Sequence, residues 1–77
     1  MERKEILLKL EDIIRDVLDN NSLIIDENTT AEDIEEWDSL TNVQIVVEMQ
    51  KVFGKKFSAK DILLWECVSD MIDSIMK

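Results

Sequence analysis

The side-chain hydroxyl of Ser39 is the group in this sequence that we single out as a candidate for covalent chemistry. It stands in the segment EWDSL, residues 36–40. A serine hydroxyl becomes a nucleophile when a neighbouring base accepts its proton. The chain has no histidine, which removes the usual general base, the serine–histidine relay and histidine metal ligands together. We therefore expect no self-contained catalytic site, and any chemistry at Ser39 would be shared with a partner.

Many of the residues that precede Ser39 are acidic, and carboxylates are typical ligands of calcium. The acidic residues of this stretch are Asp26, Glu27, Glu32, Asp33, Glu35, Glu36 and Asp38. An EF-hand loop needs a glycine at its sixth position and a glutamate at its twelfth. Counted from Asp26, those positions hold Ala31 and Trp37. We therefore set the EF-hand interpretation aside and predict no metal site.

The overall charge restricts the class of partner. With 77 residues the chain has the length of one domain, residues 1–77. It holds 18 Asp and Glu against 9 Lys and Arg, which argues against nucleic acid and anionic membranes as partners. Partners with basic docking surfaces are favoured, although acidity also serves solubility alone. Cys67 is the single cysteine, so no disulfide can form within the chain and a cytoplasmic location is expected.

The hydrophobic periodicity predicts an all-α fold that positions Ser39 at the start of a helix. The chain has no proline and one glycine, Gly54, which we expect in a left-handed conformation at a helix end. Asn20 and Asn21 are expected to end the first helix. The residues from Asn20 to Asp38 form a long connection that Leu23, Ile24, Ile25 and Ile34 can anchor onto the core. The predicted four-helix bundle has three longer helices and a short third one, over residues 3–19, 39–53, 58–64 and 68–76.

The predicted helix over residues 39–53 has two apolar stripes where a core needs one. At about 100° per residue, one side carries Leu40, Val43 and Val47. The roughly opposite side carries Ile45, Met49, Val52 and Phe53, with Val46 at its edge. The helix is therefore either buried between neighbours on both sides or leaves one face for a partner.

The arrangement around Ser39 resembles the attachment motif of acyl carrier proteins. The resemblance rests on Asp38-Ser39-Leu40 at the start of a second helix after a long acidic loop, and on Val52-Phe53-Gly54 closing that helix. It implies that a phosphopantetheinyl transferase attaches 4′-phosphopantetheine covalently to Ser39. It also implies a monomeric carrier that holds acyl groups as thioesters and catalyses no step. Without the resemblance, Asp38 or Ser39 would simply cap the helix.

The apolar stripe matches positions that carry partner contacts in similar carriers, and the acidic residues and Trp37 before Ser39 are further candidates for partner contact. The candidate partner-binding residues are Glu35, Glu36, Trp37, Asp38, Leu40, Val43 and Val47. Glu48 is the only acidic residue of the second helix, unlike the Glu-rich helix of fatty-acid-type carriers. We therefore expect acyl-processing synthase enzymes that read the acidic segment 32–38 together with the apolar stripe. Trp37 could instead cover the core.

Several further residues have two interpretations at this stage. Met49, Phe53, Ile62 and Ile72 either line an interior that accepts an acyl chain or pack in an ordinary core. Trp65 is expected to bridge the third and fourth helices. Cys67 is expected to be a semi-buried residue at the start of the last helix, with a redox role as the alternative.

Three functions remain open on the sequence alone. The first is an acyl carrier in fatty-acid-like or specialised polyketide-like biosynthesis. The second is an aminoacyl or peptidyl carrier, although such carriers more often have glycines and a histidine before the serine, which residues 36–38 do not supply. The third is an unmodified helical adaptor that only binds a protein partner.

Overall fold

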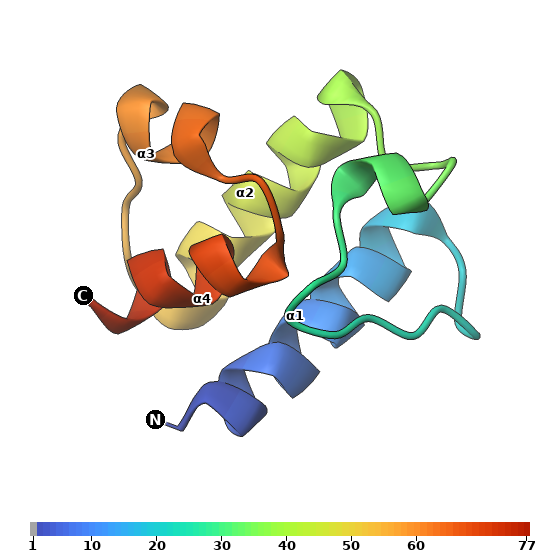
Figure 1. The fold of residues 1–77 in the computed structure, drawn as a ribbon, viewed down its shortest axis with the longest axis horizontal. Helices are drawn as coiled ribbons and strands as arrows, with labels where there is room; N and C mark the ends of the chain where they lie inside the picture. Colours follow the sequence, from blue (N-terminus) through green and yellow to red (C-terminus); the bar gives the residue numbers. More distant parts are fainter. Residues whose placement is uncertain (1) are drawn as a thin grey trace.

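The computed structural model describes residues 2–77, and its regular structure is entirely helical (Figure 1). The elements are α1 (Arg3–Leu18), a 3₁₀ turn η1 (Ala31–Asp33), α2 (Ser39–Phe53), α3 (Ala59–Leu64) and α4 (Val68–Met76). The all-α prediction with three longer helices and one short helix is confirmed. The 3₁₀ turn within the long connection was not predicted. None of the helices in the described residues is long and apolar enough to cross a membrane.

The first helix supplies one continuous stripe to the core. Its buried residues follow the helical period and are Ile6, Leu10, Ile13, Ile14 and Leu18. The helix ends at Asp19, which adopts a left-handed conformation with φ of 53°, rather than at the following asparagines. Asn20 N–H then donates to the Arg15 carbonyl at 3.0 Å, which closes the helix in the manner of a C-terminal cap. α1 packs against both α2 and α4.

The second helix contributes only one of its two apolar stripes to this core. Ile45, Val46 and Met49 are buried, and Phe53 packs against the core from its edge. Val52 was assigned to the same side, but next to the end of the helix it is 47% exposed and does not join the core. The helix ends at Gly54, whose φ of 62° is the left-handed conformation predicted for it.

The long connection is fixed to the core by alternate side chains. Ile25 and Ile34 are buried and Leu23 is partly buried, whereas Ile24 is 79% exposed and does not act as an anchor. Ile25 faces α1, where its N–H donates to the Glu11 carboxylate at 3.0 Å, and the adjacent Ile24 side chain is left in solvent. The prediction for Ile24 was therefore wrong.

The same connection also caps the last helix. The N–H groups of Val68 and Ser69, at the start of α4, donate to the carbonyls of Thr29 and Glu27, each at 2.9 Å. These bonds satisfy backbone donors that a helix start leaves without an intrahelical partner. The loop before α2 and the start of α4 are therefore held together by backbone hydrogen bonds.

An ionic cluster joins α1, the loop and α4. The guanidinium of Arg3 donates to Glu27 at 2.6 Å, to Asp73 at 2.6 Å and to the Ser69 hydroxyl at 3.0 Å. The hydrogen bonds from Arg3 hold the pKa of the Glu27 carboxyl below its usual range. Because these groups are partly exposed, solvent screens the attraction and the stabilisation is modest.

This lowered pKa predicts acid sensitivity. The folded-state pKa of Glu27 lies below the unfolded value of about 4.3, so its contribution to stability is present above that value and is lost as the pH falls through the folded pKa. When the pH is lowered below about 4, the thermal unfolding midpoint should decrease. Circular dichroism measures this midpoint. Glu27→Gln and Arg3→Gln should each make this fall less steep. An unchanged pH dependence in both variants would show that the cluster does not contribute.

Candidate functional site

The start of α2 is fixed by a reciprocal cap between Asp38 and Thr41. The Asp38 carboxylate accepts hydrogen bonds from the N–H groups of Leu40 at 3.0 Å and Thr41 at 2.9 Å. In return, the Thr41 hydroxyl accepts from the Asp38 N–H at 2.8 Å. Together these bonds form a capping box. They make Asp38 the residue before the helix and Ser39 its first residue.

The same bonds keep Asp38 ionised. The hydrogen bond from the Thr41 backbone N–H, with further bonds from the Thr41 hydroxyl and the Leu40 N–H, holds the pKa of the Asp38 carboxyl below its usual range. A negative charge therefore stands beside Ser39 at neutral pH. Asp38 caps the helix, as expected, and this role does not exclude contact with a partner because the residue is exposed.

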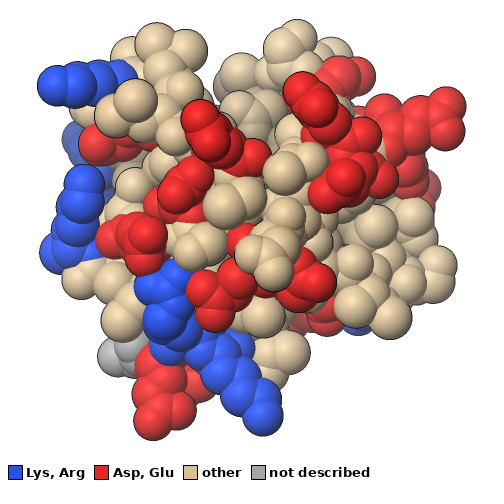
Figure 2. All heavy atoms as spheres, in the orientation of Figure 1, with Lys and Arg blue, Asp and Glu red and all other residues tan. Residues whose placement is uncertain are grey.

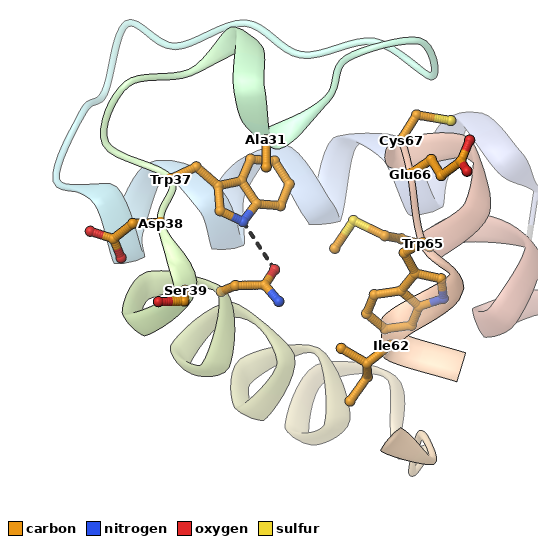
Figure 3. Close-up of a pocket in the computed structure, with 10 residues that line it drawn as sticks. Ala31, Trp37, Asp38, Ser39, Ile62, Trp65, Glu66 and Cys67 are labelled. Carbon is orange, nitrogen blue, oxygen red and sulfur yellow. Dashed lines mark hydrogen bonds between the residues drawn. The ribbon is translucent and has the colours of Figure 1, made fainter. Parts of the chain in front are cut away.

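Ser39 is exposed, and its hydroxyl has no hydrogen-bond partner within residues 2–77. Figure 3 shows its side chain pointing away from the neighbouring cavity, on the same side as Asp38. A helix start carries a partial positive charge that favours a bound anion. The geometry therefore fits a covalently attached phosphate diester, because the oxygen is accessible and free of competing bonds.

Trp37 precedes the cap and is 8% exposed. Its indole N–H donates to the side-chain carbonyl of Asn42 at 3.0 Å, and its ring joins the hydrophobic core. Of the two interpretations of Trp37, the structure therefore supports the covering of the core, and the surface left for a partner contact is small. The role of Asn42 could not be predicted from the sequence, because it depends on where the indole lies.

A cavity of about 300 Å³ opens beside Ser39 (Figure 3). It is lined by Ala31, Trp37, Asp38, Ser39, Asn42, Ile62, Trp65, Glu66, Cys67 and Met71. Of the four residues suggested for an acyl-accepting interior, Ile62 alone lines it. Met49 and Ile72 are fully buried core residues, and Phe53 packs against the core. Ordinary core packing therefore describes these three residues.

On the far wall of the cavity, Trp65 is held by two contacts of its own. The Trp65 indole N–H donates to the Ser74 hydroxyl at 2.8 Å, and its ring meets Phe57 edge-on at 5.2 Å. The predicted bridge between α3 and α4 is confirmed. Cys67 is half-buried at the N-cap of α4, which matches the expected semi-buried position.

The apolar stripe of α2 that does not enter the core is open to solvent. Leu40, Val43 and Val47 are 68%, 60% and 42% exposed. Val43 and Val47 also line a groove shared with the end of α1, with the acidic residues Asp16 and Glu48 beside them. Of the two explanations for a helix with two stripes, burial on both sides is therefore wrong.

Acidic side chains lie over the long loop and also over α4, while basic groups lie along the α3 side and the lower edge of the same view (Figure 2). Glu35 and Glu36 are both exposed, and Glu36 accepts a hydrogen bond from the Asn20 amide at 3.1 Å. Within residues 2–77, no group of three or more acidic, cysteine or histidine residues is arranged to hold a metal ion.

The comparisons with known proteins agree with this geometry. The family model described as "Phosphopantetheine attachment site" matches residues 9–75. The solution structure of a holo acyl carrier protein from Geobacter metallireducens is similar, with a TM-score of 0.84 and 30% sequence identity, over 91% of this chain and 80% of that one. No match was found among curated proteins. The chain belongs to the acyl carrier protein family, so it is a carrier with a covalent 4′-phosphopantetheine arm and not itself an enzyme.

Proposed function

We propose that Ser39 carries the arm, and that the chain is a stand-alone acyl carrier in fatty-acid-like or specialised polyketide-like biosynthesis. When bound, the arm supplies a terminal thiol on which acyl groups are held as thioesters. The observation that carries the proposal is the exposed, unpaired Ser39 hydroxyl at the first residue of α2, within the described residues 2–77. The Asp38–Thr41 capping box holds this residue outside the core, where a transferase can reach the oxygen.

The attachment chemistry needs no base from this chain. The Ser39 oxygen would bond to the phosphorus of the phosphopantetheine group in coenzyme A. The serine proton would leave to a base of the transferase, and adenosine 3′,5′-bisphosphate would depart. This division of labour agrees with the absence of histidine from the sequence.

The proposal is tested by intact-mass analysis. The purified chain is incubated with coenzyme A and a phosphopantetheinyl transferase, and its mass should rise by one phosphopantetheine. Incubation with an acyl-coenzyme A should add the acyl-bearing arm instead. A chain that stays at its original mass with several transferases would instead be an unmodified adaptor.

We further propose that partner enzymes dock with basic surfaces on the acidic segment 32–38 and on the stripe of Leu40, Val43 and Val47. The exposure of the stripe beside Ser39 supports this arrangement, because a partner that covers it also reaches the arm. Opposite charges speed the encounter of two proteins and fix their orientation.

Charge reversal at Glu35 and Glu36 should therefore slow partner binding. In the double variant Glu35→Lys/Glu36→Lys, association with the transferase at low salt should be about tenfold slower, with less effect at high salt. The matched control is Glu2→Lys/Glu5→Lys at the start of α1, which Figure 1 places far from the start of α2. Stopped-flow measurement provides the rates. Equal slowing in both double variants would mean that only net charge matters.

A further inference from the structure

We propose that the cavity beside Ser39 is a resting site for the pantetheine part of the arm. In this site, the side-chain amide of Asn42 donates a hydrogen bond to an amide carbonyl of the arm. The inference rests on the proposed attachment at Ser39. It assigns a ligand of defined chemistry, a linear group with two amides and a dimethyl centre, to a cavity that the attachment reaction itself does not require.

The orientation of the Asn42 amide is fixed by Trp37. An indole N–H can only donate, so the atom facing it must be the carbonyl oxygen of Asn42, at 3.0 Å. The amide NH₂ group therefore lies on the other side of the side chain, and it has no hydrogen-bond acceptor within residues 2–77. Asn42 is half-buried and lines the cavity. Its NH₂ group can therefore donate a hydrogen bond to an amide carbonyl.

The walls of the cavity suit the apolar parts of the same group. Figure 3 shows Trp37 on one side of the cavity and Trp65 and Ile62 together on the opposite side. Both indoles are held by hydrogen bonds of their own, Trp37 to Asn42 and Trp65 to Ser74. Largely preformed apolar walls with a few placed polar groups are the usual features of a small-ligand site.

The size of the cavity favours the arm over a long acyl chain. A volume of about 300 Å³ lies at the lower end of small-molecule pockets. Met49 and Ile72, which could have lined a deeper channel, are fully packed in the core. The arm is also tethered at the rim, so its high effective concentration makes weak contacts sufficient for docking.

The direction of the Ser39 side chain implies two positions for the arm. Because it points away from the cavity (Figure 3), the arm leaves the serine toward solvent and must bend back to dock. A partner enzyme can therefore draw the arm out without moving a helix.

The inference is tested by NMR on ¹⁵N-labelled protein before and after loading. The chain has two tryptophans, and both line the cavity, so both indole N–H signals report on it. Loading is first confirmed by intact mass. Both indole signals and the side-chain NH₂ signals of Asn42 should then shift between the unloaded and loaded proteins.

Asn42→Asp isolates the proposed hydrogen bond. A carboxylate still accepts from the Trp37 indole but cannot donate to the arm. The shift of the Trp65 indole signal on loading should therefore fall by more than half, although the substituted side chain would not touch the Trp65 N–H. The matched control is Gln44→Asp, which adds the same charge on an exposed position of α2 outside the cavity. It should keep the wild-type shift.

Two results would overturn the inference while leaving the attachment site intact. One is a loaded protein whose indole signals coincide with those of the unloaded protein. The other is a full Trp65 shift in loaded Asn42→Asp. A wild-type chain with no mass gain would overturn the Ser39 proposal itself, and this inference with it.

Discussion

Replacing Ser39 with alanine should abolish the mass gain from phosphopantetheine completely. The substitution removes the oxygen that would bond to phosphorus, and no neighbouring group can substitute for it, since the hydroxyl of Thr41 is engaged in the capping box. The fold should be preserved. Asp38 supplies the cap, and the exposed Ser39 side chain makes no hydrogen bond within residues 2–77. The free energy of unfolding should therefore change by less than about 0.5 kcal/mol.

The matched control is Ser58→Ala, at the start of α3. Ser58 is also exposed at a helix start, where its hydroxyl accepts a hydrogen bond from the Asp61 N–H at 3.1 Å. Its loss should cost about 1 kcal/mol of stability and leave the loading reaction unchanged. A mass gain that persists in Ser39→Ala would place the attachment at another residue.

Replacing Trp37 with alanine should lower the free energy of unfolding by about 3–5 kcal/mol. The ring is 8% exposed and belongs to the core, so its removal leaves a cavity and also deprives Asn42 of its hydrogen-bond donor. Domains of this size are only marginally stable, and a substantial unfolded fraction at about 37 °C is expected. Urea denaturation followed by circular dichroism measures the change.

Leu40→Ala is the control that separates the core from the proposed docking face. Leu40 lies three residues from Trp37 but is 68% exposed, so its truncation should cost less than about 0.5 kcal/mol. It should instead weaken binding to the transferase. If Trp37→Ala were as stable as Leu40→Ala, Trp37 would belong to the partner surface after all.

The sequence predicted the helices well where local signals set their ends. The bounds of α2 and α4 agree with expectation, because Asp38 and Gly54 delimit α2 and the apolar spacing defines α4. The predicted start of α3 at Ser58 differs by one residue, since the serine is the cap and not the first helical residue. Such signals act within a few residues and do not depend on the rest of the fold.

Features that depend on contacts between residues far apart in the chain could not be predicted from the sequence. The turn η1 had a local signal, the Thr30–Asp33 capping box, but it was hidden in a run of carboxylates. The burial of Trp37 and the exposure of Ile24 depend on which side of the loop meets α1. The cavity needs Trp37 and Trp65 from separate elements, and their approach is a result of the tertiary packing alone.

In the proposed docking arrangement, the exposed stripe on α2 separates partner recognition from folding within one helix. Leu40, Val43 and Val47 contribute little to the core, while Ile45 and Met49 on the other side are fully buried. Under the proposed docking arrangement, substitutions along this stripe would change which enzymes accept the carrier at almost no cost in folding. For pathway engineering, the residues of this proposed docking face could be exchanged while the residues of the core stay the same.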